Sequence, residues 1–170
     1  LRAERWTLCG TAGRQLRWAR MLSDLHVLTI VLVAIPMALV LAHALEYPGK
    51  MRLARDDYLT VQPIYSPGFT IGGFAEPASL FALVILLFLT PPGTAAFWLI
   101  LAAFAAMALM HVTYWLVTHP VNKFWLKDAN LKGASAAFFE TGAGAFETED
   151  WRNLRDRWEM SHIVRAILSF

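Results

Sequence analysis

The sequence predicts an all-α, polytopic membrane protein: an antiparallel bundle of four transmembrane helices, with the fourth helix truncated at the C-terminus. Composition is the first reason, because 57% of the 170 residues are hydrophobic and only 16% are charged, unlike a soluble globular domain. Length is the second reason. Stretches at residues 25–45, 68–90 and 94–118 are each long enough to cross about 30 Å of hydrocarbon as a helix.

Residues 1–20 are predicted to form a basic interfacial arm. They contain five arginines, with Trp6 and Trp18 between them. Such an arm would touch anionic headgroups or a partner, or would be the ordinary positive flank of a membrane helix. Because positive flanks stay in the cytoplasm, we expect a multi-pass protein of the bacterial inner membrane with a cytoplasmic N-terminus.

Residues 21–170 are predicted to form a single membrane bundle. We expect helices at about residues 23–46, 69–90, 94–118 and 149–170, with a long loop at residues 119–148. Pro36 should kink the first helix and Pro77 the second. The fourth helix begins with polar residues and runs into an apolar segment at the end of the chain. We therefore expect the chain to be a fragment whose natural ends are missing.

Polar residues that are unusual in a membrane occur near the end of the first helix, the start of the second, the end of the third and the start of the fourth. In an antiparallel bundle these four places share one side of the membrane, and ionisable residues there indicate a functional site. The candidate catalytic residues are His43, Glu46, His162 and Arg165, and the candidate ligand-binding residues are Tyr65, Glu76, His111, Asn122 and Trp158.

Two spacings raise the question of a metal. His43-x-x-Glu46 and Glu159-x-x-His162 each place an imidazole and a carboxylate on neighbouring turns, as in di-metal carboxylate bundles. One interpretation is iron or copper held by these four residues, and another is haem held by paired histidines. The third is a metal-free polar network in which Glu159 pairs with Arg155 one turn back. The spacings leave all three open.

Several classes of function are excluded by the motifs. There is a single cysteine and no zinc-binding spacing, and no Ser/His/Asp arrangement, phosphate loop or dinucleotide fingerprint. The net charge of +2 is small and scattered over loops, so we expect no nucleic-acid partner.

Three stretches resemble a known family: residues 43–50 continuing to 58–62 and Tyr65, residues 120–122 with Trp125, and residues 151–162. Together they resemble bacterial four-helix membrane proteins similar to the anthrone-oxygenase-like family, over roughly residues 40–170. The resemblance implies a four-transmembrane bundle and, by looser analogy, oxygenation of polycyclic phenolic anthrones without a flavin. The recurring polar residues of the family fall on His43, Glu46, Pro48, Lys50, Gln62, Tyr65, Asn122, Trp158, Glu159 and His162.

Two functions are compatible with these observations. The favoured one is an accessory subunit of a larger membrane complex, with other membrane subunits and the lipid bilayer as partners. The alternative is a pocket that binds and oxidises a small aromatic molecule such as a quinone or anthrone. There, His162 or His43 would take a proton, Glu46 or Glu159 would set the imidazole tautomer, and Arg165 would stabilise the enolate, while Trp158 and Tyr65 would hold the ring.

Overall fold

The structure is a computed structural model that describes residues 2–126 and 150–170. Within these residues it contains helices and no strand, so the predicted all-α class is confirmed for this part of the chain. Most of the predicted loop at residues 119–148 lies outside the described residues.

The first element, α1 (Arg2–Lys50), is a single helix of 49 residues. The residues of the predicted basic arm (1–20) and of the predicted first helix (23–46) thus lie on one continuous helix, and an interfacial role of residues 1–20 stays a prediction. Pro36 and Pro48 both lie inside the helix. Each proline removes one backbone hydrogen bond from the helix. Ending the helix within hydrocarbon would leave many more backbone groups without a partner, so the helix continues through the proline.

The segment after α1 folds back as short helices, where the sequence predicted a polar loop. Helix α2 (Arg55–Val61) is followed by the 3₁₀-helix η1 (Gln62–Tyr65). Next come α3 (Gly68–Gly73) and α4 (Ala75–Leu89). The chain is thus interrupted at Phe74 and not at Pro77, because Pro77 occupies the first turn of α4, where backbone N–H groups have no helical partner to lose.

Helix α5 (Ala95–Thr113) is capped by Thr94, whose side chain accepts a hydrogen bond from the Phe97 N–H. It continues without a break through the π-helix η2 (Tyr114–Thr118) into α6 (His119–Leu126), so the predicted end at residue 118 is wrong. In η2 the His119 N–H donates to the Tyr114 carbonyl, five residues back. The last element, α8 (Trp151–Ser169), is capped by the side chain of Asp150.

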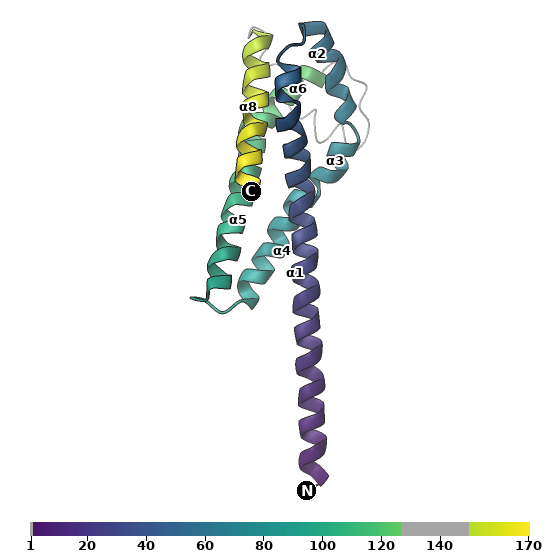
Figure 1. The fold of residues 1–170 in the computed structure, drawn as a ribbon, viewed down its shortest axis with the longest axis vertical. Helices are drawn as coiled ribbons and strands as arrows, with labels where there is room; N and C mark the ends of the chain where they lie inside the picture. Colours follow the sequence, from purple (N-terminus) through teal and green to yellow (C-terminus); the bar gives the residue numbers. More distant parts are fainter. Residues whose placement is uncertain (1, 127–149) are drawn as a thin grey trace.

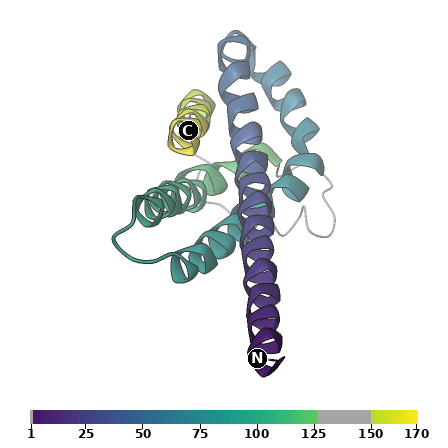
Figure 2. The same ribbon diagram turned by 60° about the horizontal axis from the view of Figure 1, so that its bottom comes forward.

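Four helices pack around one another: α1 contacts α4 and α8, and α5 contacts the same two helices. Figure 1 shows α1 and α5 running in one direction and α4 and α8 in the other. The short helices α2, α3 and α6 gather at the end where α1 finishes (Figure 1). In the turned view of Figure 2, the N-terminal half of α1 again projects beyond the other helices.

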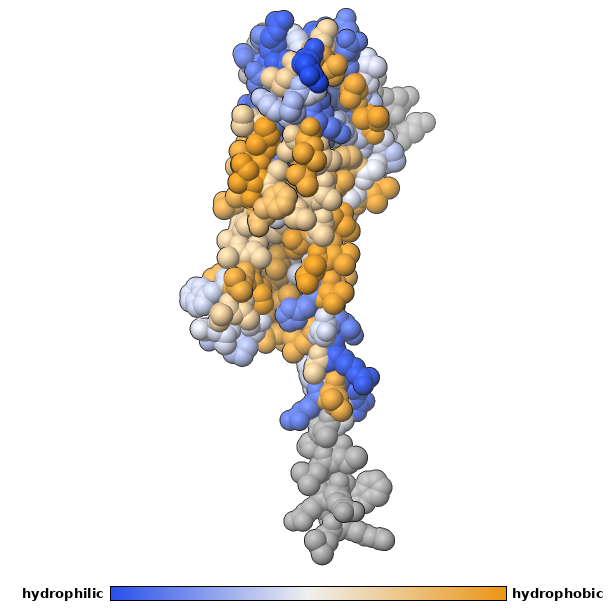
Figure 3. Space-filling view, viewed as in Figure 1, coloured by the Kyte–Doolittle hydropathy of each residue, from blue (hydrophilic) through white to orange (hydrophobic). Residues whose placement is uncertain are grey.

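Three helical stretches are long and apolar enough to cross a membrane: Gly13–Lys50, Gly68–Leu89 and Ala95–Asn122. Figure 3 shows a broad hydrophobic belt between hydrophilic ends, as expected for a chain surrounded by lipid. Large apolar side chains such as Phe81, Phe88 and Leu99 are exposed. These features indicate a multi-pass membrane protein. Helix α8 is not among the three stretches.

A buried ion pair joins α4 to α8. The Nη2 atom of Arg165 donates to Oε2 of Glu76 over 2.6 Å, and the two side chains are only 7% and 6% exposed. Removing one partner of a buried pair is costly because the other charge is left without compensation.

We therefore expect Arg165→Met to lower the free energy of unfolding by about 3–5 kcal/mol, measured by denaturation in mild detergent. The matched control is Arg55→Met, since Arg55 and its partner Asp56 are 54% and 93% exposed and should change stability by less than about 1 kcal/mol. The double variant Glu76→Gln/Arg165→Met should recover part of the loss. Equal effects of Arg165→Met and Arg55→Met would contradict the role of the ion pair.

Candidate functional site

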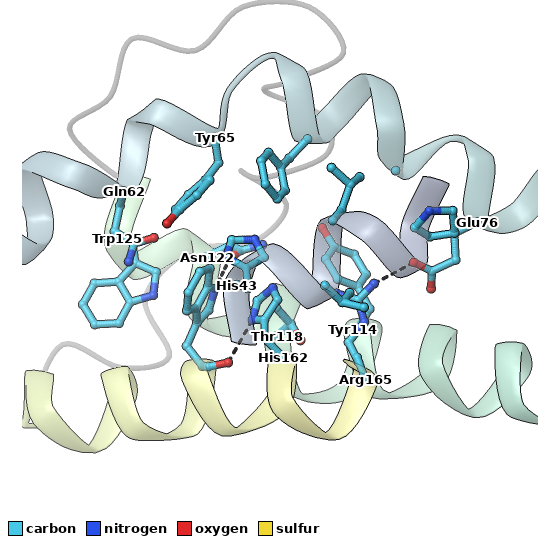
Figure 4. A pocket seen from close by; sticks show the side chains of 16 residues that line it. His43, Gln62, Tyr65, Glu76, Tyr114, Thr118, Asn122, Trp125, His162 and Arg165 are labelled. Carbon is cyan, nitrogen blue, oxygen red and sulfur yellow. Dashed lines mark hydrogen bonds and ion pairs between the residues drawn. The ribbon is translucent and has the colours of Figure 1, made fainter. Parts of the chain in front are cut away.

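A pocket lies where the polar ends of the helices meet, and Figure 4 shows it from close by. It contains about 630 Å³ of empty space, part of which is open to the outside. Its wall is formed by Pro36, Leu39, Val40, His43, Gln62, Tyr65, Phe69, Gly73, Glu76, Tyr114, Thr118, Asn122, Trp125, Trp158, His162 and Arg165. Every transmembrane stretch and α8 thus contribute to one cavity, which is mostly aromatic and aliphatic with a few polar groups.

Two histidines lie in contact on this wall. The ring centroids of His43 and His162 are 4.1 Å apart, and each residue is 4% exposed. The Trp158 ring lies 4.1 Å from the His162 ring and 5.0 Å from the His43 ring. A tryptophan therefore supports both imidazoles, and Figure 4 shows the two histidines near the middle of the pocket.

Hydrogen bonds fix which nitrogen of each neutral ring carries the proton. His162 Nδ1 lies 3.0 Å from the Trp158 carbonyl oxygen, which can only accept, so this nitrogen donates. His43 Nδ1 lies 3.2 Å from Lys50 Nζ, an ammonium that can only donate, so this nitrogen accepts. The remaining Nε2 atoms then differ: that of His162 carries a lone pair and can accept a hydrogen bond, and that of His43 is an N–H donor.

Lys50 is the central cation of the site. Its Nζ lies 2.9 Å from Glu46 Oε2 and 3.7 Å from Glu159 Oε1, and the side chain is 5% exposed. His43 Nδ1 is 3.9 Å from Glu46, farther than it is from Lys50. The prediction that Glu46 or Glu159 sets the imidazole tautomer is therefore wrong, since Lys50 does so for His43 and a backbone carbonyl does so for His162.

Two tyrosines donate hydrogen bonds to these carboxylates. The Tyr58 hydroxyl donates to Glu159 over 2.9 Å, and the Tyr65 hydroxyl donates to Glu46 over 2.6 Å. Burial and the adjacent carboxylate raise the pKa of both tyrosines far above the usual value, so both keep their protons. The pairs attach the segment of α2 and η1 to α1 and α8.

The predicted pairing of Glu159 with Arg155 does not form. Arg155 instead directs Nε and Nη2 to Oδ1 of its neighbour Asp156, at 2.9 and 2.8 Å. Glu159 is fully buried with Tyr58 and Lys50, which approach from elsewhere in the chain.

The proposed metal ligands do not fit a metal in this arrangement. Among the residues that the structure describes, no group of three or more His, Cys, Asp or Glu side chains could hold a metal ion. The ammonium of Lys50 lies within reach of both carboxylates, Glu46 and Glu159, where a metal would have to bind. The rings of His43 and His162 touch, which leaves no space for a haem between them.

A second polar group lies beside Arg165. Glu76 accepts from Arg165 with one oxygen, and its other oxygen is 3.1 Å from His111 Nδ1. The Trp115 indole donates to His111 Nε2 over 3.0 Å, so His111 Nδ1 carries a proton and donates to Glu76. His111 does not line the pocket and reaches it only through Glu76.

The structure thus brings seven of the predicted site residues into one pocket: His43, Tyr65, Glu76, Asn122, Trp158, His162 and Arg165. Glu46 and Glu159 do not line the pocket. Both contact Lys50, and they accept hydrogen bonds from Tyr65 and Tyr58, respectively. Asn122 positions Trp158. Its Oδ1 accepts a hydrogen bond from the Trp158 indole over 2.6 Å, which holds that ring against His162.

Other pocket residues were missing from the predicted site. Gln62 was indicated only by the family resemblance, and Trp125 only by its place in a resembling stretch; Lys50, which does not line the pocket but contacts His43, was also indicated only by the resemblance. Thr118 and Tyr114 gave no signal, because their exposure to the pocket depends on the wide turn of η2.

The comparisons with known proteins place these observations in a family. A family model described as anthrone oxygenase matches residues 65–170, which include α3, α4, α5, η2, α6 and α8 and all the predicted pocket residues except His43. No curated protein and no solved structure matches the chain. The matched residues form more than half of the chain and carry His162, Trp158 and Arg165. The chain belongs to the anthrone oxygenase family.

Proposed function

We propose that the chain binds a small, flat aromatic ketone or quinone in this pocket and oxidises it. The observation that carries the proposal is the contact between His43 and His162, which presents an acceptor nitrogen and an N–H donor on one aromatic wall. The family supports an anthrone as the substrate. An anthrone is a three-ring ketone with a CH₂ group opposite its carbonyl.

The first step is removal of a proton from that CH₂ group. The product is an enolate in which the central ring has become aromatic, so this carbon is unusually acidic for a C–H group. Nε2 of His162 is the base, because the proton of the neutral ring lies on Nδ1 and Nε2 therefore carries a lone pair. The rings of Trp158 and Tyr65 hold the substrate against it.

The enolate oxygen needs hydrogen-bond donors in a pocket with little water. His43 supplies its Nε2–H, and Arg165 supplies a positive charge held in place by Glu76. Fixed donors of this kind stabilise developing negative charge because they need not reorient during the reaction.

Dioxygen is the oxidant in the second step. The carbanion carbon forms a bond to one oxygen atom of O₂, and loss of the second C–H proton with cleavage of the O–O bond produces the new carbonyl. The CH₂ group loses four electrons and O₂ gains four, so one oxygen atom enters the product and the other leaves as water with the two hydrogens.

We expect His162→Ala to slow anthrone oxidation by roughly 10²–10⁴-fold, the usual contribution of a general base. O₂ uptake and anthraquinone absorbance should be followed with the protein in mild detergent, above the rate of a protein-free blank. The control is His26→Ala, because His26 is an exposed residue of α1 that lies outside the pocket. A folded His162→Ala protein with unchanged turnover would remove His162 from the mechanism.

An accessory subunit of a larger membrane complex remains a second proposal. One observation favours it: Leu16, Trp18 and Met21 are exposed on the part of α1 that projects beyond the bundle (Figure 1). We expect partner subunits in stoichiometric amounts when the protein is extracted in mild detergent, measured by size-exclusion chromatography and mass spectrometry. A chain that elutes alone and folded would contradict this role.

We also propose that α8 is the fourth transmembrane helix and that the N-terminus is cytoplasmic in a bacterial inner membrane. Support comes from the packing of α8 along α1 and α5 and from the arginines of residues 1–20. The only cysteine, Cys9, provides a test. A membrane-impermeant thiol reagent should label Cys9 in inverted vesicles and not in intact spheroplasts, and the reverse pattern would invert the topology.

A further inference from the structure

The pocket contains buried N–H donors that the protein leaves unused. Among the described residues, the buried polar atoms without a hydrogen-bond partner are Gln62 Nε2, Trp125 Nε1, Arg165 Nε and Glu159 Oε2. The first three belong to residues that line the pocket, and these residues are only 5%, 6% and 6% exposed. All three unused groups on the wall are therefore donors.

Buried donors are rarely left unpaired, because each gives up its hydrogen bonds to water and receives none in exchange. The unpaired acceptor Glu159 Oε2 belongs to a residue that does not line the pocket, and three side chains of the site already use acceptor oxygens within the protein. Asn122 Oδ1 accepts from Trp158, Glu46 Oε2 accepts from Tyr65, and both oxygens of Glu76 have partners. A molecule that enters the pocket with oxygen acceptors would supply the partners that the three donors lack.

The donors are divided between two places. Gln62 and Trp125 come from η1 and α6, which pack against each other, whereas Arg165 comes from α8 and is held by Glu76 of α4. Figure 4 shows Gln62 and Trp125 toward one end of the pocket and Arg165 with Glu76 toward the other, with His43 and His162 between them.

We propose that Gln62 Nε2 and Trp125 Nε1 form a subsite for one oxygen atom of the ligand, separate from the oxygen that Arg165 receives. A carbonyl or phenolate oxygen has lone pairs for both donors. The molecule that fills both places is then the oxidised product, a flat aromatic ring system with oxygen atoms at two opposite positions. The substrate brings its carbonyl oxygen to Arg165, and the oxygen added at its CH₂ carbon, beside His162, reaches Gln62 and Trp125. This subsite rests on the proposed function, since it assigns the orientation of the same aromatic ligand.

Arg165 cannot test this subsite cleanly, because its ion pair also joins α4 to α8. Gln62 and Trp125 can. Gln62→Met keeps a side chain of similar length without the N–H group, and Trp125→Phe keeps an aromatic ring without the indole N–H. The two changes remove the same subsite from different helices, so either folded variant decides the question.

The probes are anthracene and 9,10-anthraquinone, which share one ring frame and differ by two opposite carbonyl groups. Binding to the protein in mild detergent is measured by quenching of tryptophan fluorescence or by calorimetry. We expect the wild-type protein to prefer anthraquinone, and each variant to lose roughly fivefold of this preference while binding anthracene as before, in line with one hydrogen bond.

The matched control is Thr118→Val. Thr118 also lines the pocket, but its hydroxyl is already paired with Ser161 at 2.8 Å, so the preference for anthraquinone should be unchanged. A second readout is stability. Without ligand, Gln62→Met should not lower the melting temperature, because it removes an unpaired buried donor.

The outcomes separate the two proposals. Failure of the wild-type protein to bind either probe would overturn the proposed function and the subsite with it. Equal binding of both probes, or an unchanged preference in folded Gln62→Met and Trp125→Phe, would overturn the subsite and leave aromatic binding in place. Loss of the preference in these variants but not in Thr118→Val supports the subsite.

Discussion

The ammonium group of Lys50 is the interaction on which the site depends. It lies at the end of α1, contacts Glu46 on the same helix and Glu159 on α8, and donates to His43 in the pocket. A buried charge is tolerated only with compensating partners, and here the partners are themselves held by Tyr65 and Tyr58. One cation therefore sets the positions of α1, α8 and the segment of α2 and η1, and with them the placement of both imidazoles.

On the pocket wall, buried polar atoms that lack a hydrogen-bond partner differ in type from those that have one. Among the described residues, the buried polar atoms on the pocket wall that lack a partner are N–H donors, whereas both oxygens of the Glu76 carboxylate have partners. A bundle that needed only stability would be better served by apolar residues at Gln62 and Trp125, because burying an unpaired donor lowers the stability of the folded state. Such a cost is common at binding sites, where a fold gives up stability for function.

Much of this arrangement follows from the sequence. Apolar lengths predict the membrane helices, and the alternation of chain direction predicts that His43, Glu76 and His162 meet. The partners of charged residues were less predictable. Glu159 was expected to pair with Arg155 on its own helix, but its partner Tyr58 is 101 positions away, and only tertiary packing brings the two together. Likewise, Pro48 and Gly49 are typical helix breakers, yet α1 continues through them to place Lys50. The folding back of residues 55–65 depends on the packing of Tyr58 and Tyr65 against tryptophans of α6 and α8, which no local pattern reveals.

The π-helix η2 determines the direction in which the side chains of α6 point. One residue advances a helix by about 100°, so the wide turn at Tyr114–Thr118 rotates α6 relative to a regular continuation of α5. Only in this phase do Asn122 and Trp125 both face the cavity. Deleting a single residue from η2 would turn both side chains away together, without changing the composition of the helix or its length in the membrane by more than about 1.5 Å. The pocket therefore depends on the number of residues in η2 as strictly as on their identity.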